Sequence, residues 1–320
     1  MLTLEDLVFP APEVCQSILE ERLKDVLEQG RVLSKNPEAE EALHDVRVAV
    51  RRARVWFKRC NTCVDIPRKA RRGLSSFARE SSPVRDLEVQ ESWLAGVPAR
   101  AEQKPGWQAL RERLAEEHAQ RRAALMQTLP EALEGAQRAL DQMRIAKGAD
   151  DEPFGSWMSE HWMDAAEAYL SAVHHLPEGL HPLRLVGKQL RYMLEPLADA
   201  LGAADTLRQL RQGQDAMGRM NDVAVLASAF PAHASILLAR QHEEAIRFAL
   251  EMGVAPRWTT PSTWSGLRAV SQALIDEETE ALAALHGWRL STGDALAEAL
   301  PRIGVQLAGS AAFDGFGNPV

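Results

Sequence analysis

The sequence predicts an all-α protein built from two related helical halves. Apolar residues recur at spacings of three and four through most of the 320 residues, which is the period of an amphipathic helix. No stretch shows the apolar–polar alternation of a half-buried strand bounded by turns. A pattern rich in histidine and arginine occurs twice, at positions 44–58 and 181–195. These observations together indicate helices, arranged as an internal duplication.

Proline and glycine divide the chain into the expected helices. Pro37 follows Asn36 and suits the first position of a helix, and Ser81-Ser82-Pro83 predicts a turn. The helices expected from this punctuation are, in order, 14–33, 37–60, 67–79, 85–97, 107–147 with an interruption at Pro130, 154–173, 181–200, 204–217, 221–230, 233–253, 263–286 and 294–308.

A turn-rich segment separates the two expected halves. Residues 148–153, Gly-Ala-Asp-Asp-Glu-Pro, contain the residues that most often interrupt helices. We therefore predict a first helical half over 14–147, with its basic helix at 37–60, and a second half over 153–308, with the matching helix at 181–200. Residues 309–320 are expected to form a loose C-terminal tail.

Composition and charge favour an ordinary globular protein. Hydrophobic residues make up 46% and charged residues 26% of the chain, and the formal net charge is −8. We find no secretory signal and no apolar run of about 20 residues.

Three cysteines do not make a disulfide framework, so we interpret Cys60 and Cys63 as buried residues in a reducing compartment. We expect a cytoplasmic protein that binds no membrane, and the negative charge argues against nucleic acid as a partner.

Within this acidic chain one segment is strongly basic. Between Arg47 and Arg72 there are ten Lys or Arg residues and a single acid, Asp65. On a helix, five basic residues at offsets 0, 3, 7, 10 and 14 fall within an arc of roughly 80°; they are His44, Arg47, Arg51, Arg54 and Lys58. Such a row, about 20 Å long, suits a long anion better than a small one.

The opposite face of this helix is apolar and predicts packing into a core. It contains Val46, Val50, Ala53 and Phe57. The same basic spacing returns 137 residues later, at His181, Arg184, Lys188 and Arg191. A second segment, Arg85-Asp86-Leu87, matches Asn221-Asp222-Val223 at a shift of 136 residues. The agreement of two independent shifts predicts two halves facing each other about a pseudo-twofold axis.

These segments resemble the conserved-histidine α-helical (CHAD) domain family. The two basic segments are similar to its signature helices; residues 85–89, 218–222 and 284–288 resemble its further signatures. The resemblance implies two helical bundles with a basic cavity between them, which binds inorganic polyphosphate without catalysis and without a cofactor. It also implies an association with polyphosphate granules in bacteria. The second half departs from the pattern, because Glu195 stands where the first half has Lys58, and a lopsided cavity is one interpretation of this difference.

The resemblance and the basic rows together suggest a set of polyphosphate-binding residues, in which arginine would hold phosphate oxygens with its planar fork of donors. The set comprises His44, Arg47, Arg51, Arg52, Arg54, Lys58, Arg72, His181, Arg184, Lys188 and Arg191. The two histidines would either contact phosphate or orient the start of their helices. Arg72 would either extend the anion path or belong to a solvated face. Asp86 and Asp222 would repel phosphate, so we expect them to support the structure.

Two other classes of function remain as alternatives. Glu41 and His44, and likewise Glu178 and His181, form Glu-x-x-His pairs of the kind that hold iron in helical bundles; the neighbouring arginines would repel a divalent cation. The second alternative is a protein-interaction module that uses its acidic surface and eight tryptophans. No grouping of nucleophile, base and orienting residue is evident, so we predict no catalysis. The sequence does not indicate an oligomeric state.

Overall fold

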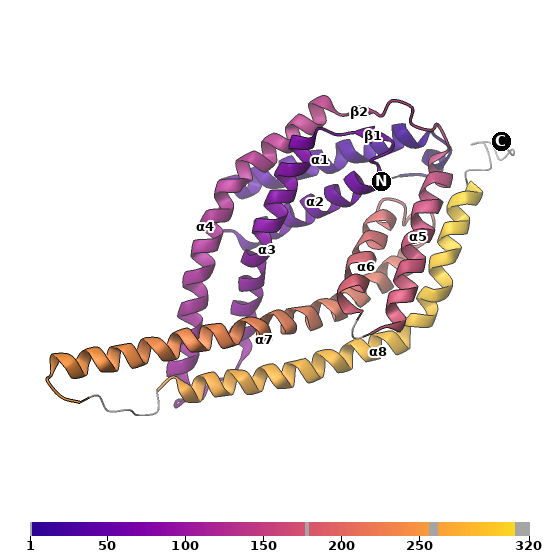
Figure 1. Cartoon of the computed structure of the whole chain (residues 1–320). Helices are drawn as coiled ribbons and strands as arrows, with labels where there is room; N and C mark the ends of the chain where they lie inside the picture. The colour runs from indigo at the N-terminus through magenta and orange to yellow at the C-terminus, as the bar shows by residue number, and fades with distance from the viewer. Residues whose placement is uncertain (1, 177–178, 256–261, 311–320) are drawn as a thin grey trace. The chain divides into compact units, whose positions relative to one another are not determined.

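The computed structural model describes residues 2–176, 179–255 and 262–310, and it confirms the all-α class (Figure 1). Its elements are η1 (Glu5–Leu7), α1 (Ala11–Lys35), α2 (Glu40–Arg59), β1 (Val64–Asp65), α3 (Arg68–Gly96), α4 (Lys104–Gln142), β2 (Arg144–Ile145), α5 (Phe154–His174), α6 (Leu180–Leu194), α7 (Ala204–Glu251) and α8 (Trp264–Ser310). The strands were not expected from the sequence. They form one short antiparallel pair, in which Val64 lies opposite Ile145, and leave the class unchanged.

Several predicted helix boundaries are wrong, because residues that often interrupt helices lie inside long ones here. Pro83, Pro130, Pro231 and Pro301 all lie inside helices. The expected turn at Ser81-Ser82-Pro83 is therefore part of α3, the three helices expected between 204 and 253 are the single helix α7, and the two expected between 263 and 308 are α8. An interior proline costs about 3 kcal/mol, and apolar packing on both sides of each proline can offset that cost.

The ends of two helices also differ from prediction. α6 ends at Leu194 rather than at 200, because Pro196 has no N–H with which to continue the helical hydrogen bonds. α8 continues to Ser310, so the first two residues of the predicted tail are helical. Residues 311–320 lie outside the described part of the chain.

The chain divides into two compact units that combine segments from distant parts of the sequence. The first unit contains residues through Ser81, Leu125–Met217 and the chain from His286; the second contains Ser82–Ala124 and Gly218–Leu285. Each unit thus takes segments from both predicted halves, 14–147 and 153–308. The internal duplication stays a prediction from the sequence.

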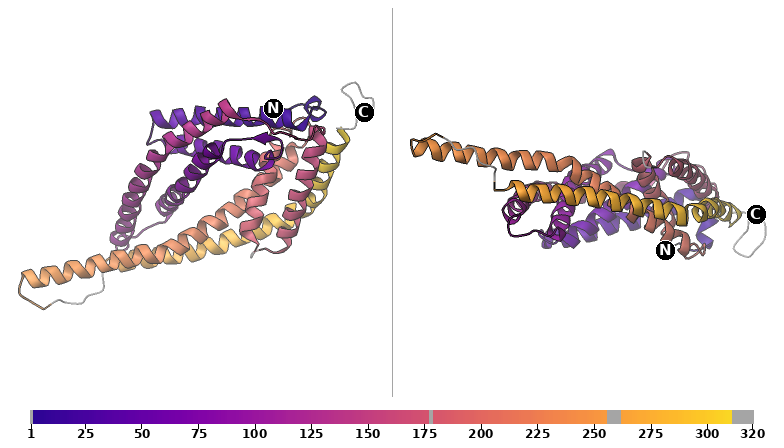
Figure 2. Two further views of the ribbon diagram at one scale, coloured as in Figure 1. Left: turned by 45° about the horizontal axis from the view of Figure 1, so that its top comes forward. Right: turned by 90° about the horizontal axis from the view of Figure 1, so that it is seen from below.

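In the first unit, two helix pairs and the end of α8 build the core. α1 lies along α2, and α5 lies along α6, as the views of Figures 1 and 2 show. Trp162 of α5 is fully buried and donates a hydrogen bond from Nε1 to the carbonyl of Leu300 in α8, at 2.7 Å. Ser159, three residues earlier, donates to the carbonyl of Gly304 at 2.8 Å. These bonds fix α8 against the pair that contains α6.

In the second unit, leucines and one valine from four helix segments form one apolar cluster. They lie on the parts of α3, α4, α7 and α8 that belong to this unit. The buried members are Leu87, Leu94, Leu110, Leu114, Leu226, Leu237, Leu267, Val270 and Leu274. This cluster holds the four segments together by burial of apolar surface.

α7 is apolar as well as long. Among the described residues it is the one helix whose length and composition would allow it to cross a membrane, and 22% of the relevant stretch is buried. This differs from the sequence prediction that no such stretch exists. Length and composition alone are weak grounds for a membrane span, because helices of soluble proteins share them.

Candidate functional site

The amphipathic pattern of α2 determines how its basic row is presented. Val46, Val50, Ala53 and Phe57 are all at most 5% exposed, which confirms the predicted apolar face. The basic residues therefore lie on the accessible side of the helix. Arg47 and Arg51 are half-buried, whereas the other three, His44, Arg54 and Lys58, are exposed.

α6 presents its own basic row by the same division of faces. Leu183 and Leu190 are fully buried, and Gly187 lies so close to α5 that an added Cβ would be 3.0 Å from the ring of Tyr169. Leu183, Gly187 and Leu190 thus form the buried face of α6, and the opposite face lies at the edge of the core. Arg184, Lys188 and Arg191 lie on that face, and all three are half-buried.

The two rows meet at Lys188. The pKa of this lysine is lowered to about 7, first by burial and in addition by the positive charges of Arg184, Arg51, Arg191 and Arg47. Two of these arginines come from α2 and two from α6. The structure thus brings together five of the predicted site residues, Arg47, Arg51, Arg184, Lys188 and Arg191, which we call the basic cluster.

A carboxylate at the end of α6 joins the two helices beside this cluster. Glu195 accepts a hydrogen bond from Nε of Arg52 at 2.8 Å and lies 3.5 Å from Nε of Arg191. The guanidinium carbons of Arg52 and Arg191 also lie 6.0 and 4.7 Å from the centre of the Tyr192 ring. Arg52, a predicted site residue, is therefore already ion-paired in this structure.

Two further bonds fix the position of α2. Nη2 of Arg59 donates to Oε1 of Gln189 in α6, at 2.8 Å. Nη1 of Arg47 donates to the backbone carbonyl of Ser81 in α3. Arg47 consequently has a structural contact as well as its place in the basic cluster.

The other predicted site residues lie on α2, α3 and α6 and are exposed. They are His44, Arg54 and Lys58 on α2, Arg72 on α3 and His181 on α6. Their accessible positions are compatible with an anion path longer than the basic cluster. The roles suggested for the two histidines and for Arg72 stay predictions.

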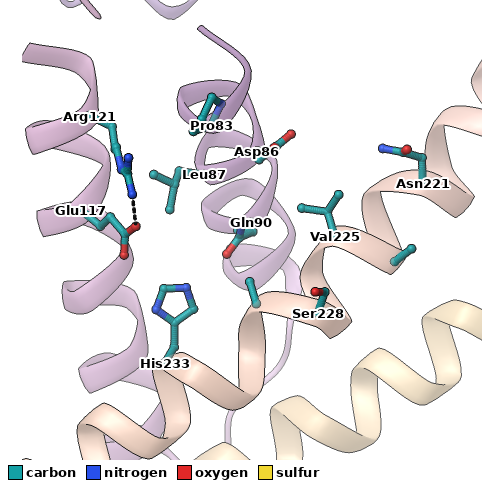
Figure 3. A pocket seen from close by; sticks show the side chains of 12 residues that line it. Pro83, Asp86, Leu87, Gln90, Glu117, Arg121, Asn221, Val225, Ser228 and His233 are labelled. Carbon is teal, nitrogen blue, oxygen red and sulfur yellow. Dashed lines mark ion pairs between the residues drawn. The ribbon is translucent and has the colours of Figure 1, made fainter. Parts of the chain in front are cut away.

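The second unit contains a cavity of about 450 Å³, which is lined by residues of two of the three further signature segments, 85–89 and 218–222 (Figure 3). α3 contributes Asp86 and Gln90, α4 contributes Glu117 and Arg121, which form the ion pair drawn in the figure, and α7 contributes residues including Asn221 and His233. None of the arginines of the two basic rows lines this cavity.

Asp86 and Asp222 belong to this unit, and both are half-buried. Asp86 lines the cavity, and Asp222 follows the lining residue Asn221 on α7. The supporting role that the sequence suggests for these two carboxylates stays a prediction.

The metal-binding alternative finds no arrangement to support it in the described part of the chain. Glu178, the partner of His181 in one Glu-x-x-His pair, lies outside the described residues. Among those described, no group of three or more His, Cys, Asp and Glu residues is arranged to hold a metal ion.

Sequence reasoning missed four residues that build this site: Arg59, Gln189, Tyr192 and Glu195. Each acts across the α2–α6 contact or beside it. The sequence shows Glu195 as a departure from the repeated basic pattern. Its negative charge in a basic row was the one feature of these four residues that sequence reasoning could have used. Contacts between residues more than 100 positions apart, such as Arg59 with Gln189, leave no mark in helical spacing.

Comparisons with known proteins agree with this architecture. The family model described as the CHAD domain matches residues 17–231. The crystal structure of the CHAD domain from the plant Ricinus communis superposes with a TM-score of 0.61 at 20% sequence identity, covering 93% of this chain and 94% of that one. PptA from Streptomyces chartreusis gives a TM-score of 0.59 at 14% identity, covering 88% of this chain and 100% of that one. No curated protein matches the chain.

Both solved structures have low sequence identity to this chain, so they support its fold alone. The family model matches more than half of the residues, and this match shows the family. The chain belongs to the CHAD domain family.

Proposed function

We propose that this protein binds inorganic polyphosphate, without catalysis, at the basic cluster of its first unit. The observation that carries the proposal is the position of Lys188, half-buried among Arg184, Arg51, Arg191 and Arg47. Like charges held this close repel one another, and the repulsion is relieved when an anion binds between them.

The chemistry of the cluster suits a chain of phosphates better than a single phosphate. Guanidinium groups remain charged at any physiological pH and can donate two parallel hydrogen bonds to phosphate oxygens. Cations from two helices would contact successive phosphoryl groups, and the exposed Arg54 and Lys58 would continue the row along α2. Neutralising several phosphates at once releases their counterions, so the affinity should depend strongly on salt, as it does for nucleic acids.

The family supports this ligand over other polyanions, since polyphosphate binding is what the CHAD resemblance implies. The net charge of −8 disfavours a nucleic acid, whose extended surface would also meet the acidic parts of the protein. We propose the cytoplasm, and polyphosphate granules within it, as the setting in which the protein acts.

A calorimetric titration of the full chain with polyphosphates of several defined lengths, at two salt concentrations, tests the proposal. Orthophosphate at the same total phosphate concentration serves as the comparison. We expect binding that strengthens with chain length and weakens with salt, and little or no binding of orthophosphate. The proposal is wrong if no polyphosphate binds at low salt, or if orthophosphate binds as tightly as the longest chain.

A further inference from the structure

Glu195 is an acid at the edge of a site proposed to bind an anion. Its side chain is 12% exposed and lies against Arg52, which is 31% exposed, and Arg191, which is 19% exposed. In the repeated pattern it takes the place of Lys58. A carboxylate at this position repels a polyanion and by itself weakens its binding. We therefore ask which interaction of Glu195 could strengthen that binding.

The atoms that Glu195 contacts suggest what that contribution is. Both contacts run through Nε, at 2.8 Å for Arg52 and 3.5 Å for Arg191. Nε is one corner of the guanidinium fork, and the two terminal nitrogens carry the other four N–H groups. Glu195 therefore leaves the terminal nitrogens of both arginines to other acceptors.

The ring of Tyr192 lies close to the same two guanidiniums. Arg191 lies 4.7 Å and Arg52 6.0 Å from the centre of its ring, within the range in which a cation is attracted to an aromatic face. One arginine belongs to α6 and the other to α2. The carboxylate and the ring together hold two cations from different helices next to each other despite their repulsion.

We propose that Glu195 is a positioning residue of the polyphosphate site: it accepts a hydrogen bond from Nε of Arg52 and attracts the guanidinium of Arg191 by its charge, so that the terminal nitrogens of both arginines contact phosphate oxygens. This inference rests on the proposed function. Glu195 does not touch the ligand; it acts through the two arginines. Its effect on affinity has two opposite parts, because its charge repels the polyanion and its hydrogen bond orders the donors.

Two substitutions separate these parts. Glu195→Gln removes the charge and keeps an oxygen that can accept the hydrogen bond from Arg52, whereas Glu195→Ala removes both. We expect the glutamine variant to bind polyphosphate at least as tightly as the wild type. We expect the alanine variant to bind about fivefold more weakly, although it has lost a negative charge, because unordered arginines bind phosphate less well. An alanine variant that binds as tightly as the wild type, or more tightly, would overturn the inference.

A double-mutant cycle measures the coupling between Glu195 and Arg52 in polyphosphate affinity, which a general loss of structure would not reproduce. Once Glu195 is alanine, replacing Arg52 by Gln should weaken binding less than it does in the wild type. Additive losses would contradict a role for Glu195 that acts through Arg52.

Glu298→Ala is the matched control. Glu298 accepts from Arg302 at 2.8 Å in the first unit, but both side chains are 73% exposed; we expect unchanged affinity. Circular dichroism and thermal melting of each variant establish that it is folded. If the wild type itself binds no polyphosphate, the proposed function fails; if the wild type binds and the alanine variant binds equally well, only the role of Glu195 fails.

Discussion

The two units use arginine in different ways. In the second unit, Arg122 contacts Glu88 at 3.4 Å, and the two side chains are 6% and 4% exposed. Arg219 contacts both Glu277 and Glu280, at 2.6 and 2.8 Å. In the first unit, four arginines lie close enough to another cation, Lys188, to lower its pKa, although one of them, Arg191, also contacts Glu195.

The contrast shows that an anion site depends on how cations are grouped rather than on how many there are. An arginine whose terminal nitrogens already contact a carboxylate, as those of Arg122 and Arg219 do, has exchanged its hydration for an ion pair, and an incoming anion must displace that partner. A cluster of like charges gains from any anion that enters. We therefore place the proposed ligand binding in the first unit and expect a structural role for the paired arginines of the second.

The largest expected effect tests the structural side of this contrast. Glu88 contacts Arg122 and also Arg85, at 3.3 Å, with Nε2 of His118 3.9 Å away. Glu88→Ala would leave Arg122 buried without this partner, and we expect it to lower the free energy of unfolding by about 3 kcal/mol, as for other broken buried pairs. Denaturant unfolding measures this change.

The control for this prediction is Glu80→Ala, because Glu80 forms an exposed pair with Arg79. Exposed pairs contribute about 0–1 kcal/mol. Equal effects of the two substitutions would show that the Glu88 network is not structural.

The second prediction removes the same number of charges from each unit. We expect the double variant Arg51→Gln, Arg184→Gln to bind polyphosphate roughly hundredfold more weakly, because two charge-assisted contacts are lost. The matching variant Arg121→Gln, Arg219→Gln should change the affinity by less than about threefold, because exposed ion-paired arginines contribute little. Titration calorimetry compares the two, and similar losses would remove the distinction between the units.

The third prediction concerns pH and follows from the pKa of Lys188, which is about 7 instead of 10.5. A bound polyanion favours the charged amine, so binding above pH 7 takes up a proton and the affinity falls as the pH rises. Between pH 6.5 and 8 we expect a decrease of about tenfold, since each unit of pKa corresponds to a factor of ten. In the absence of ligand the same shift destabilises the fold below pH 7, and stability rises as the pH increases from 7 towards 10.5.

Lys188→Met provides the control for the pH dependence. The variant cannot titrate at this position, whereas the end groups of polyphosphate titrate equally for both proteins. We expect the methionine variant to lose most of the pH dependence that the wild type shows. A decline of the same size in both proteins would exclude Lys188 as its source.

The smallest effect distinguishes the two rows within the first unit. Arg51 and Arg191 both lower the pKa of Lys188, but Glu195 already partly neutralises Arg191. We expect Arg191→Gln to weaken binding about threefold and Arg51→Gln about tenfold, within the range of single charge-assisted hydrogen bonds. Equal losses would refute the idea that the second row contributes less.

The helical class, the faces of α2 and the family were predictable from the sequence, because each depends on local spacing. Val46 and Val50 are buried where the period of the helix places them. The continuity of α7 through Pro231 was not predictable, because the local penalty of proline is offset by packing with segments distant in the chain.

The site was predictable in its cations but not in their arrangement. Arg184, Lys188 and Arg191 follow from the repeat, whereas the link from Arg52 to Glu195 spans 143 positions. The suggestion that Arg52 binds phosphate must now include the carboxylate that holds it. The long helices also mean that the compact units differ from the sequence halves, which helical periodicity does not reveal.

The salt dependence of polyphosphate affinity is the most direct test of the basic cluster. The slope of log affinity against log salt reports how many counterions are released, and hence how many phosphates are neutralised. We predict a steep slope for the wild type and, for the Arg51→Gln, Arg184→Gln variant, a slope shallower by about one to two, because two cations are missing. An unchanged slope in that variant would show that these arginines do not contact the polyanion and would contradict the account.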